Sequence, residues 1–221
     1  MRLSRPPTHV IYDLDGVLLD TEPFYTIATQ EIVSEFGKTF DWSIKAKMIG
    51  RRSIESAKYL VETLELPIPA EEYLARRQVR LEKLFPTARA KAGAEAFTRS
   101  LDSLGVRQAV GTSSEQRLLD LKITRHAEWF EIFRVRVTGD DPRVVAGKPH
   151  PDIFLVAANE MGAAPEDCVV FEDSPAGVEA ARVAGMQVVA LPDPSMAESE
   201  FRDADLVVSG FGEIAPADVG F

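Results

Sequence analysis

From Gly93 onward, short apolar segments alternate with longer segments in which apolar residues recur at helical spacing. The expected strands are 106–111, 135–139, 169–171, 188–191 and 206–208, and the expected helices are 94–104, 115–124, 152–161 and 176–184. Another apolar segment, His9 to Tyr12, precedes them near the start of the chain. Such alternation is typical of a parallel sheet with helices on both faces. We therefore predict an α/β fold with a doubly wound parallel sheet.

Between residues 20 and 87 the pattern is helical throughout. Thr21 can cap a first helix whose apolar stripe runs from Phe24 to Phe36, and Gly37 is suited to end it. Further helices are expected over 42–48, 53–66 and 70–84. We therefore predict two domains, a core made of 1–19 and 88–221 and an all-helical insertion of 20–87.

Two acidic pairs follow strands of the expected sheet. Asp13 and Asp15 come after the first apolar segment, with Gly16 directly behind them, and Glu172 and Asp173 follow a later strand. Like charges this close disfavour joint ionisation unless a cation compensates them. Mg²⁺ prefers oxygen ligands of this kind. Helix capping explains one acidic residue cheaply, but it does not explain why two strands end in the same way.

Two further segments have groups that suit an anion. Thr112 and Ser113 lie between an expected strand and an expected helix, where a hydroxyl and backbone N–H groups bind anions well. Taken alone, ordinary helix capping is the better explanation of these two residues. Lys148 stands in a loop stiffened by Pro149 and Pro151, which suits a point charge aimed at a phosphate oxygen. A solvated surface lysine is the alternative.

These four motifs, in this order, resemble those of the haloacid dehalogenase (HAD) superfamily. The matching stretches are 10–22 and 171–181. Within the superfamily, the likeness to phosphatases of pseudouridine 5′-phosphate extends to 48–52, 85–88, 139–142 and 185–189. The resemblance implies a Rossmann-like core, with the helical insertion acting as a cap domain.

The resemblance also implies a phosphatase that uses Mg²⁺ and an aspartyl-phosphate intermediate. Asp13 would be the nucleophile, and Asp15 would be the general acid and base. The metal would be held by the Asp13 carboxylate, the Asp15 backbone carbonyl and Asp173, with Glu172 binding directly or through water. The residues expected to hold phosphate oxygens are Thr112, Ser113 and Lys148.

The cap would close over the site and supply contacts to the substrate. The residues expected there are Phe24 and the loop residues Gly50, Arg51 and Arg52. Core packing is the alternative for Phe24, and surface charge is the alternative for the two arginines. The expected substrate is a small phosphomonoester, either a sugar phosphate or a nucleoside monophosphate.

Three other functions remain open to different degrees. A β-phosphoglucomutase-like phosphomutase uses the same motifs, although this chain has Ser53 where the mutase pattern has a cap arginine, and Arg52 could substitute. A true dehalogenase needs no acid at Asp15. A non-catalytic phospho-ligand-binding protein would be expected to lack one of Asp13, Asp15, Lys148 or Asp173, and all are present.

Amino-acid composition limits which partners the protein is expected to bind and in which cellular compartment it is expected. The formal charge of −10 argues against a nucleic-acid groove, which needs clustered cations. The single cysteine, Cys168, excludes an internal disulfide and is expected to be an inert core residue. No apolar stretch is long enough to span a membrane, and the start of the chain lacks a signal-peptide core. We expect a cytoplasmic, monomeric enzyme with no nucleic-acid or membrane partner.

Overall fold

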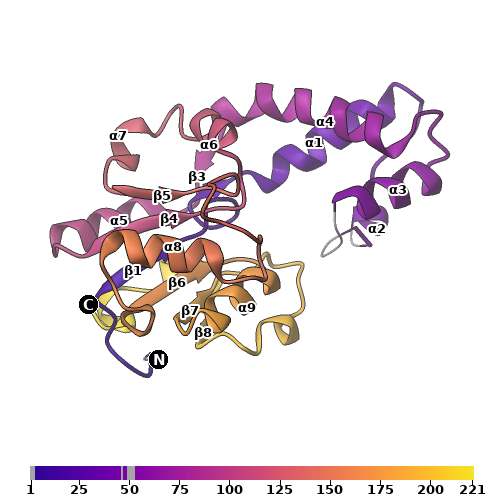
Figure 1. Ribbon diagram of the computed structural model, residues 1–221. Helices are drawn as coiled ribbons and strands as arrows, with labels where there is room; N and C mark the ends of the chain where they lie inside the picture. Colours follow the sequence, from indigo (N-terminus) through magenta and orange to yellow (C-terminus); the bar gives the residue numbers. More distant parts are fainter. Residues whose placement is uncertain (1–2, 46, 49–52) are drawn as a thin grey trace. The chain divides into compact units, whose positions relative to one another are not determined.

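The computed structural model describes residues 3–45, 47, 48 and 53–221 (Figure 1). The chain forms two compact units. One consists of Met1–Asp20 together with Ala88–Phe221, and the other is Thr21–Thr87. The insertion expected from residue 20 thus begins one residue later in the structure. We refer to these as the core unit and the helical unit.

A six-stranded parallel sheet forms the centre of the core unit. Its strands, in spatial order, are β5 (Val135–Val137), β4 (Arg107–Gly111), β1 (His9–Tyr12), β6 (Cys168–Glu172), β7 (Gln187–Ala190) and β8 (Leu206–Val207). The chain leaves β1 toward β4 and β5, then returns to β6 on the other side of β1. The direction of winding therefore reverses at β1, where doubly wound sheets bind ligands. The predicted fold class is confirmed.

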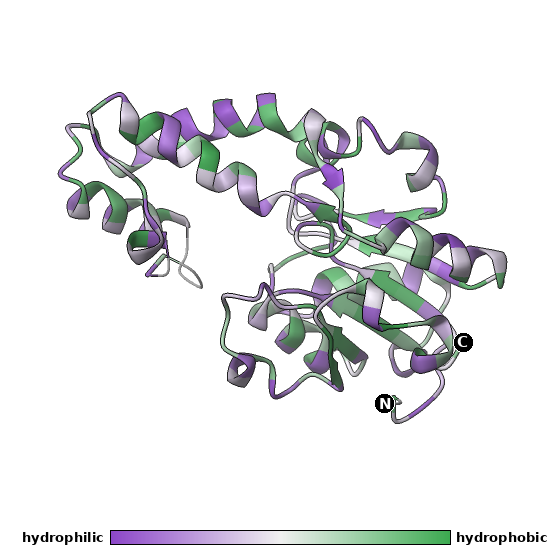
Figure 2. Cartoon of the chain, turned by 180° about the vertical axis from the view of Figure 1, so that it is seen from behind, coloured by the Kyte–Doolittle hydropathy of each residue, from purple (hydrophilic) through white to green (hydrophobic). Residues whose placement is uncertain are grey.

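Alternate residues of the strands support two different cores. Ile11 of β1 joins a mainly aliphatic cluster with helices α8 (Asp152–Met161) and α9 (Pro175–Val183). Its neighbour Tyr12 points to the other face, where its ring centroid lies 5.1 Å from that of Phe171. Because both faces are covered, the middle residues of the central strands are apolar, and polar residues are confined to the strand ends, as the colouring of Figure 2 shows.

The aromatic face is covered by helix α5 (Ala94–Ser103) and by residues near the end of the chain. The Phe97 ring of α5 lies 5.4 Å from Phe171 and 5.1 Å from Phe211, between ring centroids. Phe211 begins a short 3₁₀ turn, Phe211–Glu213. Residues far apart in sequence therefore close this face together.

Two short features of the core unit were not predicted. Helix α7 (Ala127–Phe130) is a single turn, too short to display helical periodicity. Strands β2 (Leu19–Asp20) and β3 (Arg89–Ala90) pair antiparallel where the chain leaves and re-enters the core unit. Such a pair depends on a contact between residues far apart in the chain, which the local sequence pattern does not encode.

The helix expected over 115–124 is shorter in the structure, where α6 spans Gln116–Lys122.

The helical unit contains four α-helices within the described residues. They are α1 (Glu22–Ser34), α2 (Trp42–Lys45), α3 (Ser53–Thr63) and α4 (Ala70–Leu84), and the 3₁₀ turn Phe85–Thr87 follows α4. Helices α1, α3 and α4 pack around an apolar cluster that includes Ile32, Leu60 and Tyr73. Inside it the Tyr73 hydroxyl and Thr29 Oγ1 form a buried hydrogen bond of 2.8 Å.

Two details of this unit differ from expectation. Thr21 does precede α1, but its side chain does not cap the helix, because its backbone is already near-helical at φ −98° and ψ −16°. Helix α3 ends at Thr63 instead of Leu66, and Glu65 turns the chain with a φ of +50°. None of the helices in the described part of the chain is both long and apolar enough to cross a membrane.

Candidate active site

The predicted core-domain residues come together at the carboxyl edge of the sheet. The strands that deliver them are neighbours, with β1 between β4 and β6. Asp13 and Asp15 follow β1, Thr112 and Ser113 follow β4, Glu172 ends β6, and Asp173 follows it. Lys148 reaches the same place from the loop before α8. Of the predicted cap residues, Phe24 belongs to the helical unit, and Gly50, Arg51 and Arg52 lie outside the described residues.

Lys148 joins two of the acidic residues. Its Nζ donates to Asp13 Oδ1 at 2.5 Å and to Glu172 Oε1 at 2.6 Å, and also lies 3.3 Å from the Gly111 carbonyl oxygen. The ammonium sits over the Phe154 ring, 4.7 Å from its centroid. Lys148 is therefore a buried cation bound to carboxylates, not a solvated surface lysine.

The loop that carries Lys148 is fixed by the helix that follows it. The backbone N–H groups of Val145 and Ala146 donate to Asp152 Oδ2 at 2.9 and 3.0 Å. Asp152 is the first residue of α8. This anchoring limits how far the loop can carry the ammonium from the sheet edge.

Glu172 is fully engaged by its surroundings. Its Oε2 accepts hydrogen bonds from the Asp173 and Ser174 backbone N–H groups, both at 2.8 Å, and from Ser174 Oγ at 2.9 Å. With Lys148 on Oε1, the carboxylate accepts four hydrogen bonds, which matches its usual capacity. A Cβ at Gly177 would lie 1.9 Å from Glu172 Cδ, so only glycine leaves room for this side chain.

Asp15 has a different set of partners. Its Oδ2 accepts from Lys122 Nζ at 2.6 Å and from Ser114 Oγ at 2.9 Å. Lys122 is 1% exposed. The sequence reasoning missed both partners, although one signal was present. Lys122 follows Leu118 and Leu119 by four and three residues, which puts a cation on the apolar stripe of its helix.

The acidic residues are grouped closely enough to hold a cation. One carboxylate oxygen from each of Asp13, Glu172 and Asp173 lies within 4.8 Å of the others. Gly16, at φ +79°, leaves space for Asp173, because a Cβ there would lie 1.8 Å from Asp173 Oδ2. Together with Asp15 these residues make four carboxyl groups. When all four are ionised, the positive charges of Lys122 and Lys148 leave the site with a net charge of two negative units. This donor set fits a divalent, oxygen-seeking ion such as Mg²⁺.

Burial shifts the protonation of these groups. It raises the pKa of Asp13 to about 7, against the opposing effect of Lys148 and with smaller contributions from Glu172 and Asp15. Burial also raises the pKa of Asp173 well above its ordinary value, helped by the charges of Glu172 and Asp13. Burial alone would lower the pKa of Lys148, but Asp13 and Glu172 outweigh it and raise that pKa. A bound cation would favour the ionised carboxylates.

Thr112 and Ser113 form the first part of the loop after β4. The backbone N–H of Thr112 donates to the Val137 carbonyl at 3.0 Å, and its Oγ1 accepts from the Ser114 N–H at 3.1 Å. Ser113 is exposed, and a Cβ at Gly139 would lie 2.4 Å from its carbonyl oxygen. Because the Thr112 amide is bound in the sheet, its hydroxyl is the group that can still donate to an anion.

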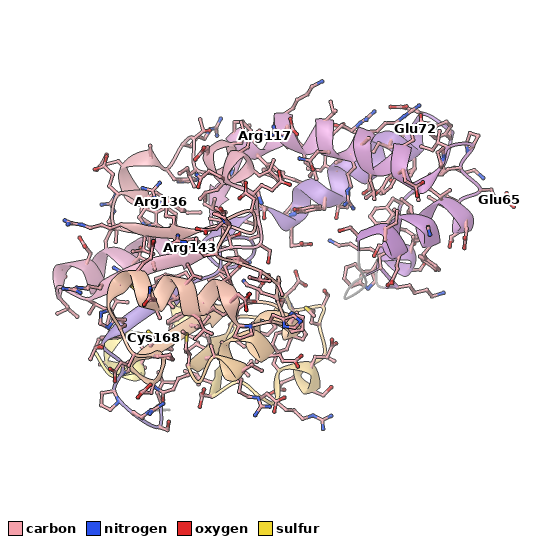
Figure 3. The ribbon with its side chains drawn as sticks, viewed as in Figure 1. Glu65, Glu72, Arg117, Arg136, Arg143 and Cys168 are labelled. Carbon is pink, nitrogen blue, oxygen red and sulfur yellow. The ribbon has the colours of Figure 1, made fainter. Side chains whose placement is uncertain are left out.

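Two residues discussed from the sequence, Phe24 and Cys168, have surroundings that ordinary packing explains. Phe24 is half-buried, and its ring centroid lies 6.4 Å from that of Phe85 in the same unit, so packing accounts for its position there. Cys168 lies buried at the amino end of β6, at the opposite end of the strand from Glu172 (Figure 3). Burial first, then Asp167 and Glu166, raise the pKa of its thiol to about 12, which makes it a poor nucleophile.

Residues 7–185 match the haloacid dehalogenase-like hydrolase family. The chain is a haloacid dehalogenase-like hydrolase. The hydrolase is 41% identical to a probable pseudouridine-5′-phosphatase of Drosophila melanogaster over 99% of its length and 96% of that protein. It is 43% identical to (DL)-glycerol-3-phosphatase 2 of Arabidopsis thaliana, covering 96% and 91% of the two chains.

A solved structure agrees with the fold of the hydrolase. The HAD family hydrolase of Deinococcus radiodurans, crystallised with phosphate and sodium, superposes with a TM-score of 0.78. It is 31% identical, and the match covers 94% of this hydrolase and 93% of that chain. The resemblance found in the four sequence motifs is therefore confirmed at the level of the family.

Proposed function

We propose that this hydrolase is a Mg²⁺-dependent phosphatase that cleaves a small phosphomonoester through an aspartyl-phosphate on Asp13. One observation carries the proposal. Two carboxylates that follow the same strand, Asp13 and Asp15, each bind a different buried lysine beside a group of acidic residues able to hold a divalent cation. Such an arrangement separates a nucleophile from an acid–base group. It also provides positive charge, from the lysines and the cation, to stabilise a negatively charged phosphoryl group.

In the first step, an Asp13 carboxylate oxygen attacks phosphorus, and the bond from phosphorus to the leaving oxygen breaks. Asp15 donates its proton to that oxygen, which departs as an alcohol. Lys148 and the Thr112 hydroxyl hold the non-bridging oxygens, together with the backbone at Ser113. Lys148 already lies 2.5 Å from Asp13 Oδ1, so a phosphate bound there would lie next to the nucleophile.

In the second step, water attacks the phosphorus of the aspartyl-phosphate. Asp15, now ionised, takes a proton from that water, and the bond from phosphorus to Asp13 breaks. Inorganic phosphate forms and both carboxylates return to their starting states. Glu172 acts in neither transfer and serves to orient Lys148, which donates to its Oε1 at 2.6 Å.

The residues that would hold Mg²⁺ are Asp13, Asp173 and the Asp15 backbone carbonyl, with Glu172 binding directly or through water. The bound ion would neutralise charge on the phosphoryl group and on the nucleophile. The helical unit would act as a cap that limits access of bulk water during the first transfer and admits the attacking water in the second.

The substrate is proposed from relatives. Those named above act, by name, on pseudouridine 5′-phosphate or glycerol 3-phosphate. Both are small phosphomonoesters of an alcohol, and we propose a substrate of this class, with pseudouridine 5′-phosphate as the first candidate. The contacts expected from Arg51 and Arg52 would decide between pseudouridine 5′-phosphate and glycerol 3-phosphate.

Asp13→Asn tests the proposal directly. The amide cannot form a stable acyl-phosphate, while its size preserves packing, so we expect turnover of p-nitrophenyl phosphate to fall below detection with an unchanged fold. Activity of the wild-type protein should require added Mg²⁺ and disappear with a chelator. More than a few per cent of residual activity in Asp13→Asn, free of deamidation, would exclude the covalent route.

The phosphomutase alternative calls for a different measurement. A mutase transfers the phosphoryl group back to its sugar, so a bisphosphorylated hexose and a hexose 1-phosphate should yield isomerised hexose 6-phosphate. We expect inorganic phosphate instead. Isomerised product formed faster than phosphate would reassign the chain as a mutase.

A further inference from the structure

We propose that Lys122 and Ser114 are positioning residues that hold the Asp15 carboxylate in place for proton transfer. The inference rests on the proposed function in assigning acid–base chemistry to Asp15. It goes beyond that function by naming a second buried lysine, distinct from Lys148, as part of the machinery. We call Asp15, Ser114 and Lys122 the Asp15 clamp.

The clamp is a closed triangle of hydrogen bonds. Lys122 Nζ donates to Asp15 Oδ2 at 2.6 Å and to Ser114 Oγ at 2.7 Å, and Ser114 Oγ donates to the same Oδ2 at 2.9 Å. Both donors therefore converge on one oxygen of Asp15. Two fixed donors on one carboxylate oxygen restrict rotation of the side chain more than a single flexible contact would.

Each member of the clamp is anchored to the core unit. The Ser114 N–H donates to Thr112 Oγ1 at 3.1 Å, and its carbonyl accepts from the Gly139 N–H at 2.9 Å. Lys122 ends α6 and is 1% exposed, next to the fully buried Leu119 on the same face. The ammonium therefore has little freedom to leave the Asp15 carboxylate.

Asp15 benefits from such support because part of its side chain is open to solvent. Its side chain is 26% exposed, whereas that of Asp13 is 9% exposed and bound to Lys148. A partly solvated carboxylate can rotate toward water, away from the atom to which it must deliver a proton. General acid–base catalysis requires that the group stay within hydrogen-bond reach of that atom.

A purely structural role for Lys122 explains less. A lysine in the last turn of a helix often interacts with the final carbonyl groups, but the Lys122 ammonium is directed to Asp15 and Ser114. Burying an ion pair yields little net stability once desolvation is counted. The contact is therefore better explained by the orientation of Asp15 than by the stability of the fold.

The test uses Lys122→Met, which keeps the length of the side chain and removes the charge, and Ser114→Ala, which removes one hydroxyl. Lys83→Met is the matched control, because Lys83 also lies in the last turn of a helix but is exposed. We expect kcat on pseudouridine 5′-phosphate, the first candidate substrate, to fall about 10- to 100-fold in Lys122→Met and less in Ser114→Ala, with KM nearly unchanged. The control should equal the wild type.

The leaving group provides a second readout. p-Nitrophenolate leaves without a proton, so the first step with p-nitrophenyl phosphate should stay fast in Lys122→Met while hydrolysis of the aspartyl-phosphate slows. We expect a burst of p-nitrophenolate that approaches one equivalent per enzyme, followed by slow turnover. A simple loss of folded enzyme would reduce both phases and both substrates equally, which would overturn the inference.

A double-mutant cycle with Asp15→Asn isolates the coupling. If Lys122 acts through Asp15, adding Lys122→Met to Asp15→Asn should change kcat by less than about twofold. Full additivity of the two losses would reject the clamp. A wild-type kcat in both Lys122→Met and Ser114→Ala would also reject the clamp.

One arm does not depend on phosphatase activity. In a crystal structure of Lys122→Met, the Asp15 carboxylate should leave the position it has beside Ser114 in the wild type. An unmoved carboxylate overturns the inference even if the enzyme is active. An inactive wild type with a displaced carboxylate would instead reject the proposed function and retain the positioning role.

Discussion

At the scale of single residues, the two aspartates differ in their neighbours more than in their chemistry. Asp13 is buried beside Lys148 and Glu172, and its pKa is raised to about 7 by burial. Asp15 is more exposed and bound by Lys122 and Ser114. The first is a carboxylate confined in one place, as a nucleophile must be, and the second has access to a proton.

Asp15→Asn should therefore impair chemistry without preventing binding. The backbone carbonyl of residue 15 survives the substitution, so Mg²⁺ and substrate should still bind. We expect kcat to fall about 10²–10⁴-fold with little change in KM, because general acid–base groups typically contribute that much. Steady-state kinetics over a range of substrate concentrations measures both. A change confined to KM would assign Asp15 another role.

Gly16→Ala should disturb Asp173 specifically. Gly16 has a φ of +79°, and a Cβ there would lie 1.8 Å from Asp173 Oδ2. Gly105→Ala is the matched control, because Gly105 has a φ of +75° but nothing within 4 Å of the added carbon. Both should lose about 1 kcal/mol of stability from backbone strain. Only Gly16→Ala should also weaken Mg²⁺ binding, measured by calorimetry, and equal effects in both variants would contradict the argument.

At the scale of elements, the helical unit depends on contacts between α1 and α4. Its buried hydrogen bond joins Thr29 of α1 to Tyr73 of α4 at 2.8 Å. The two residues are 44 apart in sequence, so the bond fixes how these helices pack. The cluster around Tyr73 is apolar, and an unpaired hydroxyl there would lie among apolar side chains.

Tyr73→Phe should destabilise the helical unit by leaving Thr29 Oγ1 without this partner. We expect a loss of about 1–3 kcal/mol in the free energy of unfolding. The double variant Thr29→Val with Tyr73→Phe removes both polar groups and should recover most of the loss. Urea unfolding followed by circular dichroism measures all three. A double variant less stable than Tyr73→Phe would show that the hydrogen bond is not the cause.

At the scale of the whole molecule, the stability of the core unit depends on the protonation of its acidic residues. The folded state raises the pKa of Asp13 from 3.8 to about 7, so folding favours its protonated form. The resulting stability is fully present below pH 3.8 and is lost as the pH rises through about 7. A metal ion that binds the ionised carboxylate offsets this loss.

Mg²⁺ should therefore raise Tm more at about pH 8 than at about pH 5.5, because at the lower pH the ion must displace a proton. Thermal unfolding with and without Mg²⁺ at both pH values measures the effect. Asp13→Asn is the control, since it removes one of the two proposed ligands whose pKa burial raises, and its Mg²⁺ response should vary less with pH than that of the wild type. A larger Mg²⁺ effect at the lower pH would contradict the linkage between Mg²⁺ binding and the protonation of Asp13.

The expected monomeric state, the cytoplasmic location and the absence of a nucleic-acid partner stay predictions.

The order of strands and helices, the helical insertion and the acidic strand ends were readable from the sequence. They rest on local periodicity and on residue type, and parallel strands place their carboxyl ends at one edge by geometry alone. The partners of each acid were not readable, because they depend on which distant side chains the fold brings together. Lys122 is 107 residues from Asp15, and Lys148 is 135 residues from Asp13. Tertiary structure alone decided that Asp13 and Asp15 each have their own buried lysine.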